Sequence, residues 1–253
     1  MHPSSLTCIF LVLSIWCLLT VPSLSAQSTF VVEVEGGPVW QSRNEVQIPN
    51  DERGTRFSLD GVVGQGPWPS GRLYLTWNIN RRHGLRVLLA PLSITETGSL
   101  SSQTGFAGET FQAGEAVEAT YKFNSWRLNY RYRLADREKL RLWIGFTAKI
   151  RDAKIELRQA GVSAKDTDLG FVPLLYLAAQ RELNRDWDLL FDFNGLAGGP
   201  GRAFDAALKL SYDVTDRWAL RLGYRTLEGG ADVESVYNFA WLHYALISAA
   251  YRF

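Results

Sequence analysis

Cysteine is nearly absent from this chain of 253 residues, and its two cysteines, Cys8 and Cys17, both lie close to the N-terminus. If that segment is removed, the remaining chain has neither a disulfide nor a thiol for catalysis or metal binding. An excess of charge is absent too, since 27 basic residues are balanced by 26 acidic ones. Proteins that bind nucleic acid carry a basic stripe, so we expect no nucleic-acid partner.

Long hydrophobic runs are also missing. After the N-terminal region, no run reaches the about 18 apolar residues that a transmembrane helix needs. The apolar run at residues 8–19 is followed by the small residues Ser23, Ser25 and Ala26. This pattern predicts a cleaved signal peptide over residues 1–26 and a mature chain over residues 27–253. Residues 1–5 carry no Lys or Arg, which leaves a short N-terminal membrane anchor as the alternative.

The chain is rich in aromatic residues, 13% of the total, as expected where amphipathic rings lie at a membrane interface. Apolar and polar side chains alternate clearly over residues 72–80, 140–149, 187–194 and 218–225. A period of two residues predicts β-strands with one apolar face. Alternation alone fits either a soluble sandwich or a membrane barrel.

The connections between these segments separate the two architectures, because four short polar turns alternate with five longer stretches rich in Gly and Ser. The short turns are at residues 80–84, 135–139, 184–186 and 215–217, and the longer stretches are at residues 49–70, 98–114, 160–167, 195–201 and 229–235. Outer-membrane barrels sort their connections in this way, with short turns in the periplasm and long loops outside the cell. The sequence therefore predicts an all-β fold, an antiparallel up-and-down transmembrane β-barrel of the bacterial outer membrane.

We expect about ten strands, and an even number is the rule for single-chain bacterial barrels. They cover residues 29–48, 55–80 with an interruption, 85–97, 115–134, 139–158, 168–183, 187–195, 202–214, 218–228 and 236–253. Eight or twelve strands remain open, because residues 55–65 fit either an extra hairpin arm or a folded loop. Within residues 115–134 the polar positions change parity, and a β-bulge at Asn124, Ser125 and Trp126 would restore a single polar face.

The last segment alternates up to Tyr251 and the C-terminal Phe253. A final strand that ends in an aromatic residue resembles the signal by which bacterial barrels are recognised by the barrel-assembly machinery. Lipid and lipopolysaccharide of the outer membrane are the other expected partners. Arg43, Arg53 and Arg56, near the expected outer rim, are candidates for contacts with lipopolysaccharide phosphates.

Four stretches resemble an uncharacterised family of proteobacterial outer-membrane proteins. They are residues 54–59 (GTRFSL), 123–128 (FNSWRL), 168–174 (DLGFVPL) and 236–241 (VYNFAW). The resemblance extends over nearly the whole mature chain and implies a barrel. It implies no activity, substrate or catalytic residue.

Charged residues fall on the strand faces expected to point into the barrel, whose narrow interior side chains must fill. They are Glu118, Arg127, Arg131, Arg133, Arg141, Lys149, Asp188, Asp192, Asp205, Arg221 and Arg225. Buried charges need partners, so we expect a network of ion pairs in the lumen of a structural barrel. The same residues would suit a narrow channel for small polar solutes, since rings of charge set pore selectivity.

A lipid-modifying enzyme, of the lipid A acyl hydrolase or transferase type, is the alternative function. Of the two histidines outside the expected signal peptide, His83 lies in a short turn, where a solvated side chain is expected. His243 is expected to face lipid near Tyr224 and Glu228, and with Glu228 it is a weak candidate for catalysis. We expect no metal and no cofactor, because no ligand cluster stands out and the glycine-rich residues 195–201 lack the Lys of a phosphate-binding loop.

Overall fold

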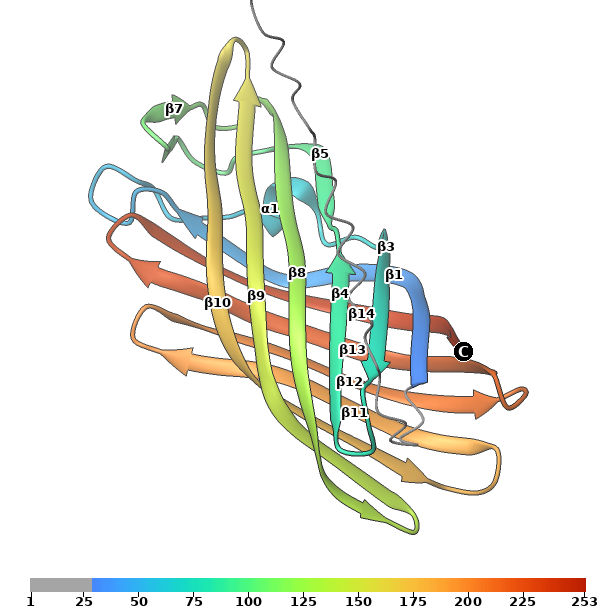
Figure 1. The fold of residues 1–253 in the computed structure, drawn as a ribbon. Coiled ribbons are helices and arrows are strands. Elements are labelled where there is room, and N and C mark those ends of the chain that lie inside the picture. Colours follow the sequence, from blue (N-terminus) through green and yellow to red (C-terminus); the bar gives the residue numbers. More distant parts are fainter. Residues whose placement is uncertain (1–28) are drawn as a thin grey trace, which may run out of the picture.

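The computed structural model describes residues 29–253, which form a closed antiparallel barrel (Figure 1). Strands that follow one another in sequence lie side by side, and the last strand pairs with the first from Val31–Arg252 to Gln47–Tyr237. In order, the wall consists of β1 (Thr29–Gln47), β3 (Trp68–Asn78), β4 (His83–Ala90) continued by β5 (Ser93–Ser99), β8 (Ala116–Arg137), β9 (Leu140–Gln159), β10 (Val162–Glu182), β11 (Trp187–Gly198), β12 (Gly201–Asp213), β13 (Trp218–Val233) and β14 (Val236–Arg252). The predicted all-β barrel of ten strands is confirmed within the described residues. The predicted signal peptide, residues 1–26, and the first two residues of the predicted mature chain lie outside them.

The predicted short turns gather at one end of the barrel, here called the short-turn end. They join β3 to β4, β8 to β9, β10 to β11 and β12 to β13. The C-terminus lies at the same end, where the backbone N–H of Phe253 donates to the carbonyl of Phe30 (2.9 Å). The opposite end is called the outer end.

Three of the five predicted long loops are wrong. Residues 160–167, 195–201 and 229–235 belong mostly to strands, and β9–β10, β11–β12 and β13–β14 are each joined by a two-residue turn. At the first turn Ala160 (φ 42°) and Gly161 (φ 87°) both have positive φ, the geometry of a tight hairpin turn. The Gly, Ser and charged residues of these three segments favour loops in the sequence, but in the structure they form hairpin arms that extend beyond the apolar band of the wall.

The two connections that are long fold into the outer mouth of the barrel as a cap. The first carries β2 (Phe57–Ser58) and α1 (Asp60–Val63), and the second carries β6 (Thr104–Phe106) and β7 (Glu109–Phe111). The cap segments are joined by backbone hydrogen bonds from Thr55 N–H to Gly105 O (2.9 Å) and from Ala107 N–H to Ile48 O (2.8 Å). No helix in residues 29–253 is long and apolar enough to cross a membrane.

The cap and the outer part of the wall share the largest apolar core. Its cap members include Leu59, Val62, Val63, Phe106 and Phe111. Its wall members include Val39, Val117, Ala119, Tyr121, Ile155, Leu157, Leu227, Leu242 and Leu246. The outer end of the barrel is therefore built like a soluble domain, with its apolar side chains inside.

Polarity inverts along β8 without any change of register, so the predicted β-bulge at Asn124, Ser125 and Trp126 is wrong. The β8–β9 pairing is continuous through Asn124–Asp152 and Ser125–Arg151, and its one shift lies between Arg133 and Ala135. The same face of β8 carries buried apolar side chains toward the outer end and buried polar ones below. The strand stays regular and its surroundings change. Toward the short-turn end, lipid surrounds the wall and the interior is polar. Toward the outer end, water surrounds the wall and the interior is apolar.

A belt of exposed apolar side chains surrounds the lower wall. It includes Val34, Leu128, Phe146, Leu177, Leu208, Leu222 and Ile247. Aromatic pairs edge it at the short-turn end, with ring centroids of Trp187 and Tyr212 4.8 Å apart and those of Trp218 and Tyr251 4.9 Å apart. An apolar belt with an aromatic edge around a closed ladder is the surface of a barrel that spans a membrane.

Candidate binding site in the barrel interior

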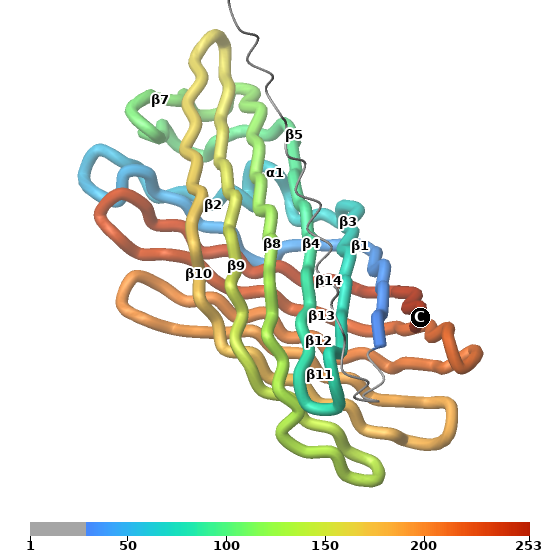
Figure 2. The backbone as a smooth tube through the Cα atoms, viewed as in Figure 1, coloured from blue at the N-terminus to red at the C-terminus, as the bar shows by residue number. Residues whose placement is uncertain are grey.

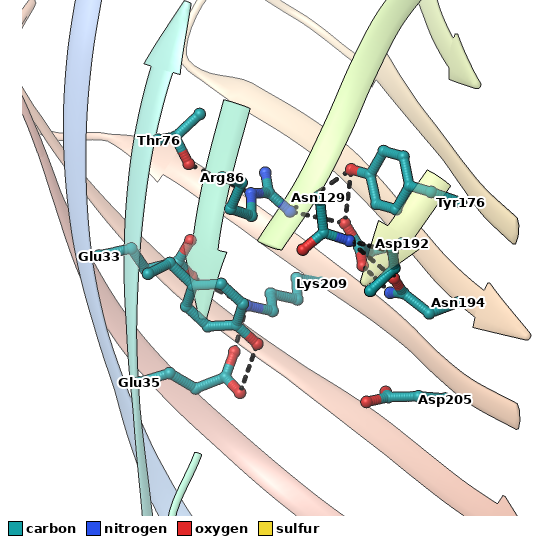
Figure 3. Close-up of polar contacts among 12 residues, drawn as sticks. Glu33, Glu35, Thr76, Arg86, Asn129, Tyr176, Asp192, Asn194, Asp205 and Lys209 are labelled. Carbon is teal, nitrogen blue, oxygen red and sulfur yellow. Dashed lines mark hydrogen bonds and ion pairs between the residues drawn. The ribbon is translucent and has the colours of Figure 1, made fainter. Parts of the chain in front are cut away.

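Two glutamates of β1 begin the lumenal network, the set of ion-paired side chains that fills the middle of the barrel (Figure 3). Glu33 and Glu35 alternate with Val32 and Val34, so both point inward. Lys209 of β12 donates to both glutamates, and its Nζ lies 2.8 Å from Glu33 Oε1. Arg221 of β13 forms a second ion pair with Glu33. The Ser248 hydroxyl also donates to Glu33 Oε1 (2.7 Å).

Asp205 of β12 is the second centre of the network: it accepts hydrogen bonds from Arg127 and Arg225 and forms a longer ion pair with Arg72, so it joins three other strands. Its oxygens lie 2.6 Å from Arg127 Nη2 and 2.5 Å from Arg225 Nη1, and Arg72 Nη1 is 3.6 Å away. Arg225 also donates to the Tyr74 hydroxyl (2.7 Å). All these charged side chains are at least nine-tenths buried, so the network closes the lumen at this level.

Asp192 of β11 is the third centre, toward the short-turn end. It accepts from Arg86 Nη1 (2.8 Å) and from the Tyr176 hydroxyl (2.9 Å), as Figure 3 shows. Asn194, two residues on, accepts from Asn129 Nδ2 (2.8 Å). Five members of the network were not identified from the sequence: Glu33, Glu35, Arg72, Arg86 and Lys209. The alternation of Glu33 and Glu35 with valines could have indicated an inward-facing acidic pair on β1.

Most residues predicted for the lumen lie there. Arg127, Arg131, Lys149, Asp205 and Arg225 are buried, and Asp192 and Arg221 are partly buried. Three others lie near the short-turn end: Arg133 pairs with Asp136 (2.9 Å), Asp188 accepts from Gln180 Nε2 (2.6 Å), and Arg141 is half-buried.

Glu118 is the exception and does not belong to the lumen. Its side chain is 47% exposed and lies 3.5 Å from Arg158 Nη1 on the outer surface. The inversion of polarity along β8 explains this, because Glu118 lies in the part of the strand whose polar face looks outward.

Above the network, the barrel holds an open cavity of about 420 Å³, here called the outer cavity. Its walls are mainly apolar and include Tyr121, Phe123, Ile155, Phe204, Leu227 and Val236. Its floor is the top of the lumenal network, with Arg127, Lys149 and Asp205. A cavity of this size with apolar walls and a few polar groups is typical of small-molecule sites.

Lys149 is the unusual residue of this floor. It is only 3% exposed, yet no hydrogen bond or ion pair joins its Nζ to any residue in 29–253. Its ammonium lies over the ring of Phe123, 4.7 Å from the centroid. Arg127, directly opposite on β8, adds a second positive charge, and its buried Nη1 also lacks a hydrogen-bond partner.

The outer rim of the cavity carries acidic side chains. Asp168 is paired with Arg151, and Asp166 lines the cavity two residues away. Burial, together with the neighbouring Asp168, raises the pKa of Asp166 above its ordinary value. The cavity is thus cationic at its floor, while its rim carries both acidic and basic side chains, Arg151 and Arg202 among them.

His243 faces outward, at the outer edge of the apolar belt. Its Nε2 is 2.8 Å from the Ser42 hydroxyl and its Nδ1 is 2.6 Å from the Tyr224 hydroxyl. Ser42 lies where the β1–β14 register shifts, a bulge that turns its side chain toward His243. The predicted pair with Glu228 is not formed, because Glu228 is bound by Arg202 at 2.7 Å.

The remaining candidates have structural partners. His83 Nδ1 lies 2.7 Å from the Tyr130 hydroxyl at the short-turn end. Arg53 pairs with Asp51 (2.6 Å), Arg56 stacks over Tyr237 (3.7 Å) and Arg43 lies over Phe239 (5.6 Å).

The Phe253 ring packs against Tyr251 (4.7 Å) and Phe30 (5.8 Å) on the outer face. No group of three or more His, Cys, Asp or Glu residues within 29–253 is placed to hold a metal.

The closed ladder, the apolar belt and the polar lumen define a membrane-spanning β-barrel of the outer-membrane type. Among solved structures, the outer membrane protease OmpT of Escherichia coli is similar with a TM-score of 0.57 at 10% identity, over 89% of this chain and 97% of that one. Ail, the attachment invasion locus protein of Yersinia pestis, aligns with a TM-score of 0.38 at 12% identity, over 88% and 99% of the two chains. Neisserial surface protein A (NspA) aligns with a TM-score of 0.37 at 12% identity, over 88% and 97%.

No protein family and no curated protein matches the sequence. At 10% identity the likeness to OmpT shows a shared fold alone. The expected membership of the uncharacterised proteobacterial family stays a prediction.

Proposed function

We propose that this protein is a non-conducting barrel of the Gram-negative outer membrane that binds an amphipathic anion in its outer cavity. The observation that carries the proposal is Lys149, a buried and unpartnered cation at the floor of an apolar cavity. An unpaired charge in an apolar site is costly, and an anionic ligand group would offset that cost. The apolar walls would hold the hydrophobic part of the same ligand.

The lumenal network argues against the narrow channel that the sequence also suggested. The inward charges pair with one another across the barrel instead of lining a path, and Asp205 alone joins three strands. Planar-bilayer recordings of the refolded protein are expected to show no current. A stable conductance would overturn this part of the proposal.

Ligand binding is tested by native mass spectrometry of the detergent-solubilised protein with stearate. We expect a one-to-one complex, and we expect Lys149→Met to weaken it about ten- to a hundredfold, the effect of losing one charge-assisted hydrogen bond. Octadecanol has the same chain without the charge and is the matched ligand control. Lys122→Met, at a lysine outside the cavity paired with Asp152 (2.7 Å), is the matched protein control. Equal binding of stearate by wild type and Lys149→Met would contradict the proposal.

Export by a signal peptide, recognition of Tyr251 and Phe253 by the barrel-assembly machinery, and contact with lipopolysaccharide belong to the same proposal. Removal of Phe253 tests the second point. The expected result is less folded protein in the membrane at an unchanged rate of synthesis.

A lipid-modifying enzyme is the second candidate, favoured by the contact between Ser42 and His243. With its Nδ1–H donated to the Tyr224 hydroxyl, His243 Nε2 is free to accept the Ser42 proton. Ser42 Oγ would then attack an ester carbonyl, the proton would pass through His243 to the leaving alcohol, and water would release the acyl group. Mass spectrometry of lipid A compares cells with wild type, Ser42→Ala, His243→Ala and no protein, and four identical spectra would remove this candidate.

A further inference from the structure

The barrel wall is incomplete between β10 and β11 in its outer half. Their pairing runs from Glu182–Asp188 to Leu175–Gly195 and stops there. Beyond that point β10 continues through Val162–Leu174, paired with β9 alone, and β11 continues to Gly198, paired with β12 alone. In Figure 2 the β9–β10 and β11–β12 hairpins diverge toward the outer end. This opening is here called the lateral gap.

Pro173 explains where the pairing stops. The N–H of Leu183 donates to the carbonyl of Trp187, the first residue of β11, whereas the N–H of Glu182 donates to the carbonyl of Lys139, next to the start of β9. Backbone groups alternate along a strand, so odd-numbered residues of β10 turn their N–H groups toward β11. Toward the outer end, the next odd-numbered residue beyond Leu175 is Pro173. Because Pro173 has no N–H, it cannot donate to the next acceptor of β11.

The lateral gap lies at the depth of the lipid. Next to it, Leu169 and Phe171 point outward from β10 and are 76% and 64% exposed. Ile150, which pairs with Phe171 from β9, is also exposed and apolar. The polar outward face of β10 begins only beyond Leu169, so the gap opens within the outer part of the apolar belt.

The outer cavity reaches the gap from inside. Residues on both of its edges line the cavity, Phe171 to Leu174 on β10 and Leu196 and Gly198 on β11. Lys149 is the direct cross-strand neighbour of Val172, one residue from Pro173. The unpartnered ammonium is therefore placed at the inner side of the opening.

We propose that the lateral gap is a portal through which a single-chain amphiphile with an anionic head group enters from the outer leaflet. This inference rests on the proposed binding function and adds the route and the source of the ligand. The head group binds at Lys149, beside Arg127, and the chain lies along the apolar walls. A chain that spans the gap also covers unpaired backbone of β10, which would otherwise face hydrocarbon.

The test is photolabelling of the protein, refolded into phosphatidylcholine vesicles, by stearate that carries a diazirine in mid-chain and is supplied from the bilayer. Wild-type protein is expected to be labelled in the cavity, at Phe123 and Phe204, and at the portal, at Leu196. Pro173→Val restores the missing donor, extends the β10–β11 ladder, and is expected to abolish cavity labelling over short exposures. Pro91→Val is the control, since Pro91 lies between β4 and β5, away from the gap.

A second variant closes the same gap reversibly. The variant carries Val172→Cys and Gly198→Cys, which would face each other if the β10–β11 register continued, and it keeps Pro173. Cys8→Ser and Cys17→Ser remove the other thiols. Oxidation is expected to abolish cavity labelling and reduction to restore it.

The outcomes separate the two proposals. If the wild-type cavity is not labelled at all, the binding function itself fails. If the cavity is labelled equally in wild type, Pro173→Val and the oxidised double-cysteine variant, binding stands and the portal is excluded. Labelling that appears only when stearate is added from water also excludes entry from the leaflet.

Discussion

Arg127 and Lys149 lie directly opposite each other on β8 and β9, two positive charges on the same inner face of the barrel. Only Arg127 has a carboxylate within bonding distance, and that carboxylate, Asp205, is shared with Arg225 and Arg72. Like charges at directly opposed positions of a sheet are destabilising. The empty barrel therefore carries an excess positive charge where the outer cavity begins.

Replacing Lys149 with Met should stabilise the protein in the absence of ligand. The change removes one of two opposed charges and keeps the volume of the side chain, so we expect a gain of about 1 kcal/mol. Guanidinium unfolding in vesicles, followed by tryptophan fluorescence, measures it. A loss of stability would mean that Lys149 has a structural partner, and it would weaken the case for a ligand at this residue.

Replacing Asp205 with Asn should be among the most damaging changes in the chain. It leaves three buried arginines without their shared carboxylate, and breaking a buried pair from one side costs about 3–5 kcal/mol. Asp136→Asn is the matched control, because its pair with Arg133 is exposed and is worth about 1 kcal/mol or less. The two variants are compared by the guanidinium midpoint of the folded barrel, and similar midpoints would refute the view that Asp205 organises the network.

The order of strands could be predicted from the sequence because alternation and turn chemistry are local. The partners in the lumen could not, since Lys209 and Glu33 are 176 positions apart and meet only when the barrel closes. The parity change at Asn124 was visible, but a bulge and an exchange of water for lipid produce the same pattern in one strand. Ser42 was missed for a similar reason, because its contact with His243 depends on the register between the first and last strands.

The cap should be separable from the barrel wall. Phe111 is fully buried in the outer core, with its ring centroid 6.4 Å from that of Phe106. Phe111→Ala should cost about 3–5 kcal/mol of packing, most of it lost from the cap. We expect faster trypsin cleavage at Arg53 and Arg56 with an unchanged β-sheet circular dichroism spectrum. Phe146→Ala, at an exposed ring on the lower outer wall, should leave the cleavage rate unchanged, and equal rates in both variants would show that the cap does not depend on this core.

Asp166 at the rim of the outer cavity should make stability depend on pH in the opposite direction from a paired carboxylate. Burial and Asp168 raise the pKa of Asp166 in the folded protein, so folding favours its protonated form. The stability contributed by the bound proton is present at low pH and is lost as the pH rises through the folded pKa. Asp166→Asn removes this loss. We therefore expect the variant to unfold at a higher guanidinium concentration than wild type at neutral pH, with the difference vanishing below the ordinary pKa of aspartate. A variant that is less stable than wild type at neutral pH would show that the Asp166 carboxylate is held by a favourable contact instead.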